Sequence, residues 1–309
     1  MKNNRQLVGH ILAIFTALVW GTTFVSSKVL LREFTPVELL FDRFLLGYLA
    51  LWLMKPGILR VKEKRHELMF AGAGLTGVCL YYLFENLALT YTQAANVSVI
   101  VSTAPLFVSI MAHFFLKEEP LQKSFFYGFA CAILGIVLLS FGGGEMVSVN
   151  LTGDMMCVLG AILWGAYSIF IKKANGFGYS VIQTTRRVFF YGILFMIPIV
   201  AVSGYRMDVG RFMTGINVAN LLFLGIIACA VCFVSWNKAV DILGAVKTSA
   251  YIYAIPVITL IASVMILHEK ITLMMGIGTA LTVVGLIVSE RGSEPHESEA
   301  VSTQQVHGL

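Results

Sequence analysis

Long apolar runs follow one another through almost the whole chain, and they constrain its fold more than any other feature. A helix crosses the hydrocarbon core of a bilayer with about 20 apolar residues, and this chain of 309 residues contains ten runs of that kind. Only 13% of its residues are charged, about half the share found in a soluble domain. Helices are predicted because membrane-spanning strands would alternate apolar and polar residues. The predicted spans are residues 7–30, 36–54, 68–90, 94–116, 123–141, 153–172, 182–203, 217–238, 245–267 and 272–289.

The first half of the chain recurs in the second half. The stretch Ala17–Lys28 returns as Ala161–Lys172, with its Trp-Gly pair and closing lysine kept, at an offset of 144 residues. Later in each copy the offset is 151, so the second copy carries extra residues, which we place near Gly204–Asn217. Such self-similarity indicates an internal repeat. The two offsets pair Gly9 with Gly153, Arg43 with Arg187, Asn86 with Asn237, Pro105 with Pro256 and Glu118 with Glu269.

Each copy contains five predicted spans. Because five is odd, the copies must cross the membrane in opposite directions, which is the plan of many secondary transporters. We therefore predict an all-α membrane protein whose ten transmembrane helices form two inverted five-helix repeats, at residues 7–141 and 153–289. Residues 290–309 are rich in Ser, Glu, Gln and His, and a disordered tail is predicted there.

The lysines and arginines indicate an orientation. With the N-terminus in the cytoplasm, 16 of the 22 lie on the cytoplasmic side and six on the other side, and cytoplasmic loops carry such an excess. Both termini are thus predicted to be cytoplasmic, in the inner membrane of a bacterium. Lys28, Lys172, Arg43 and Arg187 lie near span ends, where anchoring at the interface is the favoured explanation and recognition of a substrate charge is the alternative.

Several function classes lack support in the sequence. The net charge of +5 is not gathered on one face, as binding to nucleic acid would require. The sequence has no HExxH, GxSxG or GxxxxGK[ST] motif, so we predict no metal site, no cofactor and no enzymatic activity. Cys229 and Cys232 form a CxxC pair without further ligands, and small buried apolar side chains are the better interpretation.

Trp20 and Trp164, which the repeat matches, lie near the middle of their spans. Tryptophan prefers the membrane interface, where its N–H finds water. A pair at mid-membrane depth therefore favours a substrate cavity at the place where inverted-repeat transporters bind solutes, with packing against lipid as the alternative. Asn86 and Asn237 are further candidates, which either hydrogen-bond substrate or bridge helices. Four aromatic candidates for the cavity lining have packing as their alternative: Tyr167, Trp236, Tyr251 and Tyr253.

Glu85 lies inside the third span, and the matching position of the second copy holds Trp236. A carboxylate at that place is costly and should face a cavity or a partner. Two interpretations stay open: Glu85 couples transport to protons, or it pairs with Arg43 or Lys28 in a structural role. The carboxylates at span ends (Glu118, Glu119 and Glu269) are predicted to be solvated.

Pro105 and Pro256 lie inside the fourth and ninth spans. A proline within a helix removes a backbone hydrogen bond and kinks the helix. The matched pair predicts either two bending helices that act as gates or two static kinks.

Several of these patterns resemble EamA-type transporters of the drug/metabolite transporter superfamily. The residues that carry the resemblance are WGTTFVSSK from Trp20, ENLALTYT from Glu85, APL around Pro105, AIPV around Pro256 and HEK from His268. The resemblance spans about residues 7–289. It implies a ten-helix basket whose cavity is lined by helices 1, 3, 4, 6, 8 and 9, with helices 5 and 10 at the periphery. Helices 4 and 9 would rock to open the cavity to each side in turn.

The resulting prediction is a secondary transporter that exports a small metabolite, such as an amino acid, across the inner membrane by alternating access. The alternative is a proton-coupled efflux protein for drugs and toxic compounds. The first span lacks the carboxylate that a small multidrug relative would carry, which counts against the alternative unless Glu85 replaces it. The predicted partners are a small-molecule substrate, the lipid bilayer and, if transport is coupled, protons.

Overall fold

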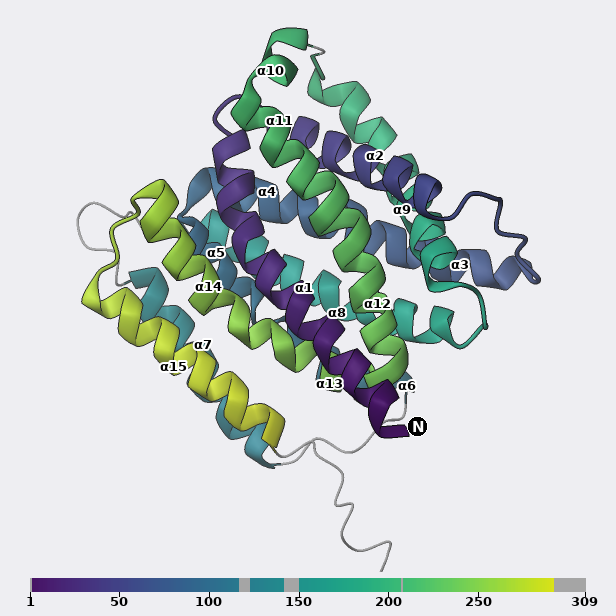
Figure 1. Ribbon diagram of the computed structural model, residues 1–309. Helices are drawn as coiled ribbons and strands as arrows, with labels where there is room; N and C mark the ends of the chain where they lie inside the picture. The colour runs from purple at the N-terminus through teal and green to yellow at the C-terminus, as the bar shows by residue number, and fades with distance from the viewer. Residues whose placement is uncertain (1, 117–122, 142–149, 207, 292–309) are drawn as a thin grey trace, which may run out of the picture.

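The computed structural model describes residues 2–116, 123–141, 150–206 and 208–291, and within them all regular structure is helical (Figure 1). Seven helical segments are long and apolar enough to cross a membrane. Three helices of 19 residues each, α2, α7 and α15, complete the predicted ten. The all-α, ten-span prediction is therefore confirmed.

The first repeat contains spans 1 to 5. They are α1 (Lys2–Leu30), α2 (Pro36–Met54), α3–η1–α4 (Lys64–Ala73, Gly74–Leu80 and Tyr81–Tyr91), α5–α6 (Ala94–Val101 and Ala104–Leu116) and α7 (Lys123–Phe141). The second repeat contains spans 6 to 10. They are α8 (Leu151–Asn175), α9 (Val181–Ser203), α11–η2–α12 (Gly215–Leu222, Phe223–Val231 and Cys232–Leu243), α13–η3–α14–η4 (Ala245–Ser249, Ala250–Ala254, Ile255–Ala262 and Ser263–Leu267) and α15 (Leu273–Arg291). The short α10 (Val209–Met213) lies between α9 and α11, among the extra residues of the second copy.

Matched glycines show that each repeat packs against the other in the same way. A Cβ placed on Gly21 would lie 2.6 Å from Ile258, and one placed on Gly165 would lie 3.0 Å from Phe107. Gly21 and Gly165 are 144 residues apart, and the residues that they contact, Ile258 and Phe107, are 151 residues apart. Each contact is therefore the counterpart of the other under the two offsets of the repeat. Accordingly, α1 packs against α12 and α14, while α8 packs against α4 and α6 (Figure 1).

The same comparison corrects the alignment of the second span. A Cβ on Gly47 would meet the side chain of Cys229, and one on Gly192 would meet that of Val78. Since Val78 and Cys229 differ by 151, these two glycines are counterparts at an offset of 145 rather than 144.

The predicted pairing of Arg43 with Arg187 is therefore wrong by one residue. The counterpart of Arg43 is Val188, and both side chains are fully buried. Arg187 is partly exposed and forms an ion pair of 2.6 Å with Glu67. One residue turns a helical side chain by about 100°, which is enough to move it from the bundle interior to its edge.

Spans 4 and 9 are broken ahead of their prolines rather than kinked by them. α5 ends at Val101 and α6 begins at Ala104, so that Pro105 lies in the first turn of α6. Pro256 similarly lies in the first turn of α14, after the 3₁₀ segment η3. The first residues of a helix need no internal partner for their N–H groups, so proline is tolerated there. Each proline therefore starts a new helix.

Several predictions concern residues outside the described part of the chain. They are the tail beyond Arg291, and Glu118 with Glu119. Below, the N-terminal face is the end of the bundle where α1 begins, and the far face is the end where α1 stops and α10 lies (Figure 1).

Candidate functional site

A pocket lies between the two repeats, with about 390 Å³ of empty volume including its mouth. Its walls come from α1, α4, α8 and both broken spans. The lining residues are Trp20, Thr23, Phe24, Tyr81, Tyr82, Glu85, Val101, Ser102, Ala104, Trp164, Ile252 and Ile255. The breaks ahead of Pro105 and Pro256 thus form part of the wall.

Trp20 and Trp164 meet at this pocket. Their ring centroids lie 5.3 Å apart at an interplanar angle of 86°, the edge-to-face geometry that aromatic quadrupoles favour. Both side chains are buried, at 6% and 3% exposure, and so do not face lipid. The Trp20 indole N–H donates to the carbonyl of Ala228 at 3.1 Å. Within the described residues, the Trp164 indole N–H has no hydrogen-bond partner.

Glu85 is the carboxylate of the pocket wall. It is 3% exposed, and Tyr81, one helical turn earlier, lines the same pocket. The Oε1 atom has no partner among the described residues, nor does a cation there lie within 4.0 Å of the carboxylate. The predicted ion pair with Arg43 or Lys28 is therefore not formed, because both cations are engaged elsewhere.

Arg43 lies behind the pocket wall. Its guanidinium is 4.5 Å from the Tyr82 ring centroid, a cation–π contact. Its Nε donates to the Cys229 sulfur at 3.4 Å and its Nη1 to the Ser27 hydroxyl at 3.5 Å. The prediction that Arg43 anchors a span end is wrong, since its side chain is fully buried inside the bundle.

A second ring of aromatic side chains supports the pocket. Phe233 is its centre and contacts Trp20, Tyr82 and Trp164 at centroid distances of 5.5, 6.0 and 6.1 Å. Trp236 lies 5.1 Å from Trp20 and 6.2 Å from Trp164, behind them as seen from the pocket. The rings therefore hold the two pocket tryptophans in fixed orientations.

The other sequence candidates lie away from the pocket wall. Tyr167 donates to Asn237 at 2.8 Å, and Asn237 donates to Thr185 at 3.0 Å, so these side chains join α8, α9 and α12. Asn86 donates to the carbonyl of Pro36 at 3.2 Å and joins α4 to α2. These three side chains bridge helices.

Two further candidates are placed by contacts nearer the N-terminal face and the periphery. The Tyr251 hydroxyl lies 2.5 Å from Nδ1 of His10 on α1. Tyr253 packs in a small apolar cluster with Leu106, Ala132 and Leu286. Neither contributes to the pocket wall.

Sequence reasoning missed Tyr81 and Tyr82 as part of the wall. They precede Glu85 by four and three residues, and residues at those spacings share one face of a helix. The signal was thus present, in the sequence YYLFEN.

The far face holds a compact set of contacts, which we call the far-face latch (Lys28, Thr92, Glu269 and the first residues of α5). Glu269 accepts hydrogen bonds from the backbone N–H groups of Ala94 at 3.0 Å and Ala95 at 3.4 Å. Lys28 lies 3.3 Å from Glu269 and donates to the carbonyl of Thr92 at 2.6 Å. The prediction that Glu269 is solvated is wrong, since its side chain is 8% exposed.

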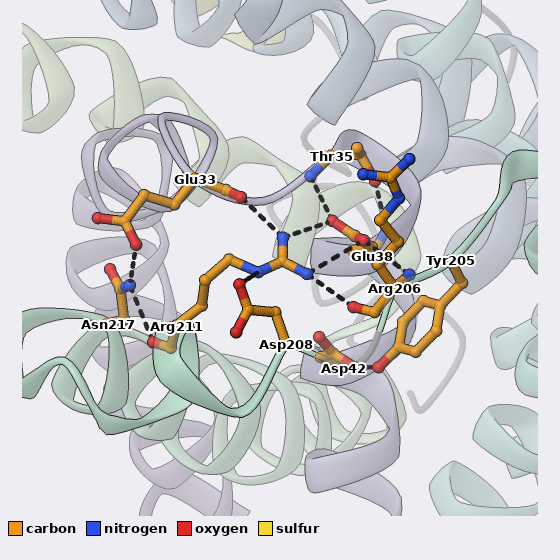
Figure 2. A network of polar contacts seen from close by, with 9 residues as sticks. All are labelled: Glu33, Thr35, Glu38, Asp42, Tyr205, Arg206, Asp208, Arg211 and Asn217. Carbon is orange, nitrogen blue, oxygen red and sulfur yellow. Dashed lines mark hydrogen bonds and ion pairs between the residues drawn. The ribbon is translucent and has the colours of Figure 1, made fainter.

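Figure 2 shows a second polar network on this face, which joins the α1–α2 corner to the extra residues of the second repeat. Arg211 of α10 donates to Glu38 at 3.0 Å and to the carbonyl of Glu33 at 2.8 Å. The Tyr205 hydroxyl donates to Asp42 at 2.7 Å. The hydrogen bond to the Glu38 carboxylate raises the pKa of Arg211 above its ordinary value, so the guanidinium stays charged. The network fastens α10 and does not line the pocket.

Comparison with known proteins gives the chain a family. The model of the EamA-like transporter family matches residues 7–141 and 151–290. An uncharacterized transporter of Archaeoglobus fulgidus is 29% identical over 91% of this chain and 96% of its own length. A probable terminal-alkyne amino-acid exporter of Streptantibioticus cattleyicolor is 25% identical over 93% of this chain and 95% of its own.

A solved crystal structure shares the fold, with a TM-score of 0.66 at 18% identity, and the match covers 96% of this chain and all of the other. The family match, in two halves that together span most of the sequence, confirms the resemblance carried by the motifs. The chain belongs to the EamA-like transporter family of multi-pass membrane transporters.

Proposed function

We propose that this protein is a secondary transporter that exports a small metabolite, such as an amino acid, by alternating access. The observation that carries the proposal is the pocket between the repeats, where Trp20 and Trp164 meet beside the Glu85 carboxylate. Inverted-repeat transporters bind substrate at such an interface near the bilayer midplane. The similarity to a protein named as a probable amino-acid exporter supports this class of substrate.

The proposal includes an orientation. The N-terminal face would be cytoplasmic in a bacterial inner membrane, because 16 of the 22 lysines and arginines then lie on the cytoplasmic side. The far-face latch would then lie at the outer end of the pocket, where it ties α5 to the loop after η4. Substrate would enter from the cytoplasm while this latch is closed.

The moving parts would be spans 4 and 9. Each is broken in the pocket wall, ahead of Pro105 or Pro256, and a break of this kind concentrates a change in φ and ψ in few residues. Motion of the two outer or the two inner half-spans would open the pocket to one side at a time. The static alternative would leave both breaks unchanged during transport.

Counterflow in proteoliposomes tests the proposal. Vesicles loaded with a mixture of the twenty amino acids should accumulate at least one labelled amino acid from outside, and empty vesicles should not. Trp164→Ala should lower the rate at least tenfold, because it removes a pocket wall. Trp52→Ala is the matched control, since Trp52 is 41% exposed and absent from the pocket. Equal rates for the two variants would contradict the assignment of the pocket.

Proton-coupled efflux of toxic compounds is the second candidate, and the buried Glu85 carboxylate is the observation that favours it. A pH gradient separates the two. Transport coupled to protons should accelerate when the gradient is imposed and lose that response in Glu85→Gln. A transport rate that does not change when the pH gradient is imposed would indicate facilitated exchange without proton coupling.

A further inference from the structure

Two residues of the pocket wall carry buried polar atoms of complementary kind. Oε1 of Glu85 is an acceptor and Nε1 of Trp164 is a donor, and neither has a hydrogen-bond partner in the described part of the chain. Both residues line the pocket, at 3% exposure each. Buried polar groups in native proteins are nearly always satisfied, so this pair points to a ligand that offers a donor to one atom and an acceptor to the other.

We infer that Glu85 and Trp164 together bind the polar end of the substrate. The Glu85 carboxylate would accept hydrogen bonds from a protonated amine, and the Trp164 N–H would donate to a carbonyl or carboxylate oxygen beside that amine. This inference rests on the proposed transport function and narrows its substrate class. The preferred substrates are amines with an adjacent acceptor and an apolar remainder.

The surroundings of Glu85 suit an ammonium group. The rings of Trp20, Tyr81 and Tyr82 line the pocket around the carboxylate, and the faces of aromatic rings attract cations. Oε1 of the carboxylate has no partner among the described residues, so it is the atom available to the ligand. A neutral or anionic group at the same place would leave the carboxylate uncompensated.

Arg43 makes the site unsuited to multiply charged cations. Its guanidinium lies behind Tyr82 and is too distant for an ion pair with Glu85. The two charges nevertheless sum to zero in the same region, so a substrate of zero or single positive charge fits best. The remaining wall is apolar, from Phe24, Val101 and Ile255, and would contact an uncharged side chain of the substrate.

Binding to the full chain in lipid nanodiscs tests the inference with four probes of one shape. L-Leucine and L-leucinamide carry both the ammonium and the acceptor, isoamylamine carries the ammonium alone, and N-acetyl-L-leucinamide carries acceptors with neutral amides in place of the ammonium. A hydrogen bond to a charged group is strong enough that its loss lowers affinity by roughly tenfold to a hundredfold. L-Leucine and L-leucinamide should therefore bind at least tenfold more tightly than either of the other probes.

Two conservative variants separate the two contacts. Glu85→Gln should remove the advantage of the probes that carry an ammonium. Trp164→Phe keeps a ring but loses the N–H, so it should remove only the advantage of L-leucine over isoamylamine. Trp52→Phe, outside the pocket, should change neither preference. Thermal unfolding of each variant establishes that it is folded.

The outcomes distinguish this inference from the proposed function. If the protein transports amino acids while both pocket variants bind all four probes as the wild type does, the inference is wrong and the transport function stands. Binding of N-acetyl-L-leucinamide as tight as that of L-leucinamide would also overturn it. A protein that neither binds nor transports any of the probes contradicts both.

Discussion

Breaking the far-face latch should open the pocket toward the far face. Glu269 follows span 9, and its carboxylate accepts the backbone N–H groups of Ala94 and Ala95 at the start of span 4. Lys28 of α1 adds an ion pair at 3.3 Å and a bond to the carbonyl of Thr92. Glu269→Ala removes every contact of the carboxylate at once, so spans 4 and 9 would separate more readily at this end.

The size of the effect follows from these contacts. Loss of a side chain that caps the first N–H groups of a helix costs about 1 kcal/mol. An ion pair at a surface contributes up to about 1 kcal/mol, and this one gains from the burial of Glu269, at 8% exposure. The sum is about 2–3 kcal/mol, because hydrogen bonds to charged groups are stronger than neutral ones. That difference corresponds to a roughly 30- to 150-fold shift toward the open form.

Labelling of a cysteine in the pocket measures this shift. Thr23→Cys places a thiol on the pocket wall, where Thr23 is 4% exposed. A membrane-impermeant maleimide should label it faster in Glu269→Ala than in the wild type, by up to the factor above, when added to intact cells. In inside-out vesicles the maleimide is added from the other side, so the difference in labelling rate should be reversed, which tests the orientation. The chain without Thr23→Cys corrects for labelling of the native cysteines.

Two further variants decide whether the latch is the cause. Lys28→Met removes only the ion pair and the bond to Thr92, so it should raise the rate less, by about fivefold for a loss of 1 kcal/mol. Lys270→Ala changes the exposed neighbour of Glu269 and should leave the rate unchanged. The reasoning is refuted if the labelling rate in Glu269→Ala lies within twofold of the wild-type rate from both sides of the membrane. It is also refuted if Lys270→Ala raises the labelling rate as much as Glu269→Ala does.

Three other predictions follow from contacts described above. Arg43→Ala should lower the free energy of unfolding by about 2–4 kcal/mol and Arg187→Ala by about 1 kcal/mol, because the first empties a buried site and the second breaks a partly exposed ion pair. Thermal unfolding measures the difference, and equal falls in melting temperature would contradict it. Arg211→Met should destabilise equally at pH 6 and pH 9, since a raised pKa keeps the guanidinium charged below its unfolded-state value and its contribution is lost only in strong alkali. Tyr167→Thr, which installs the residue of the first repeat, should weaken the preference of Trp164 for substrates with an acceptor, as the four-probe assay would measure.

Most of the fold was readable from hydropathy and the repeat, because bilayer thickness sets the length of every span. The ends of the spans were less predictable from hydropathy. Span 3 begins at Lys64 rather than at residue 68, because the helix continues into the membrane interface with polar residues that lower the hydropathy there. The breaks ahead of Pro105 and Pro256 were predicted as kinks. A hydropathy profile carries no information on which backbone hydrogen bonds are made, so it cannot tell a bent helix from two helices.

The position of the candidate site residues along their spans was readable from the sequence, but the direction in which each side chain points was not. Trp20 and Trp164 were predicted to line a cavity from their positions along the spans, and the structure places their rings 5.3 Å apart at the pocket. Asn86 is adjacent to Glu85 in sequence yet bonds to α2, because one residue rotates the side chain by about 100°. Glu269 was predicted to be solvated because nothing in the sequence shows that a helix N-terminus lies against it.

The difference in hydrogen bonding between the two pocket tryptophans follows from an exchanged residue beside Trp164. Trp20 donates to the carbonyl of Ala228, and the repeat places Gly77 where Trp164 would find its equivalent acceptor. In the second copy, however, Tyr167 stands at the position of Thr23, and its ring packs directly on Gly77. Trp164 instead lies against that ring, with centroids 4.8 Å apart. The larger side chain thus occupies the place of that backbone partner, and the Trp164 indole N–H has no partner among the described residues.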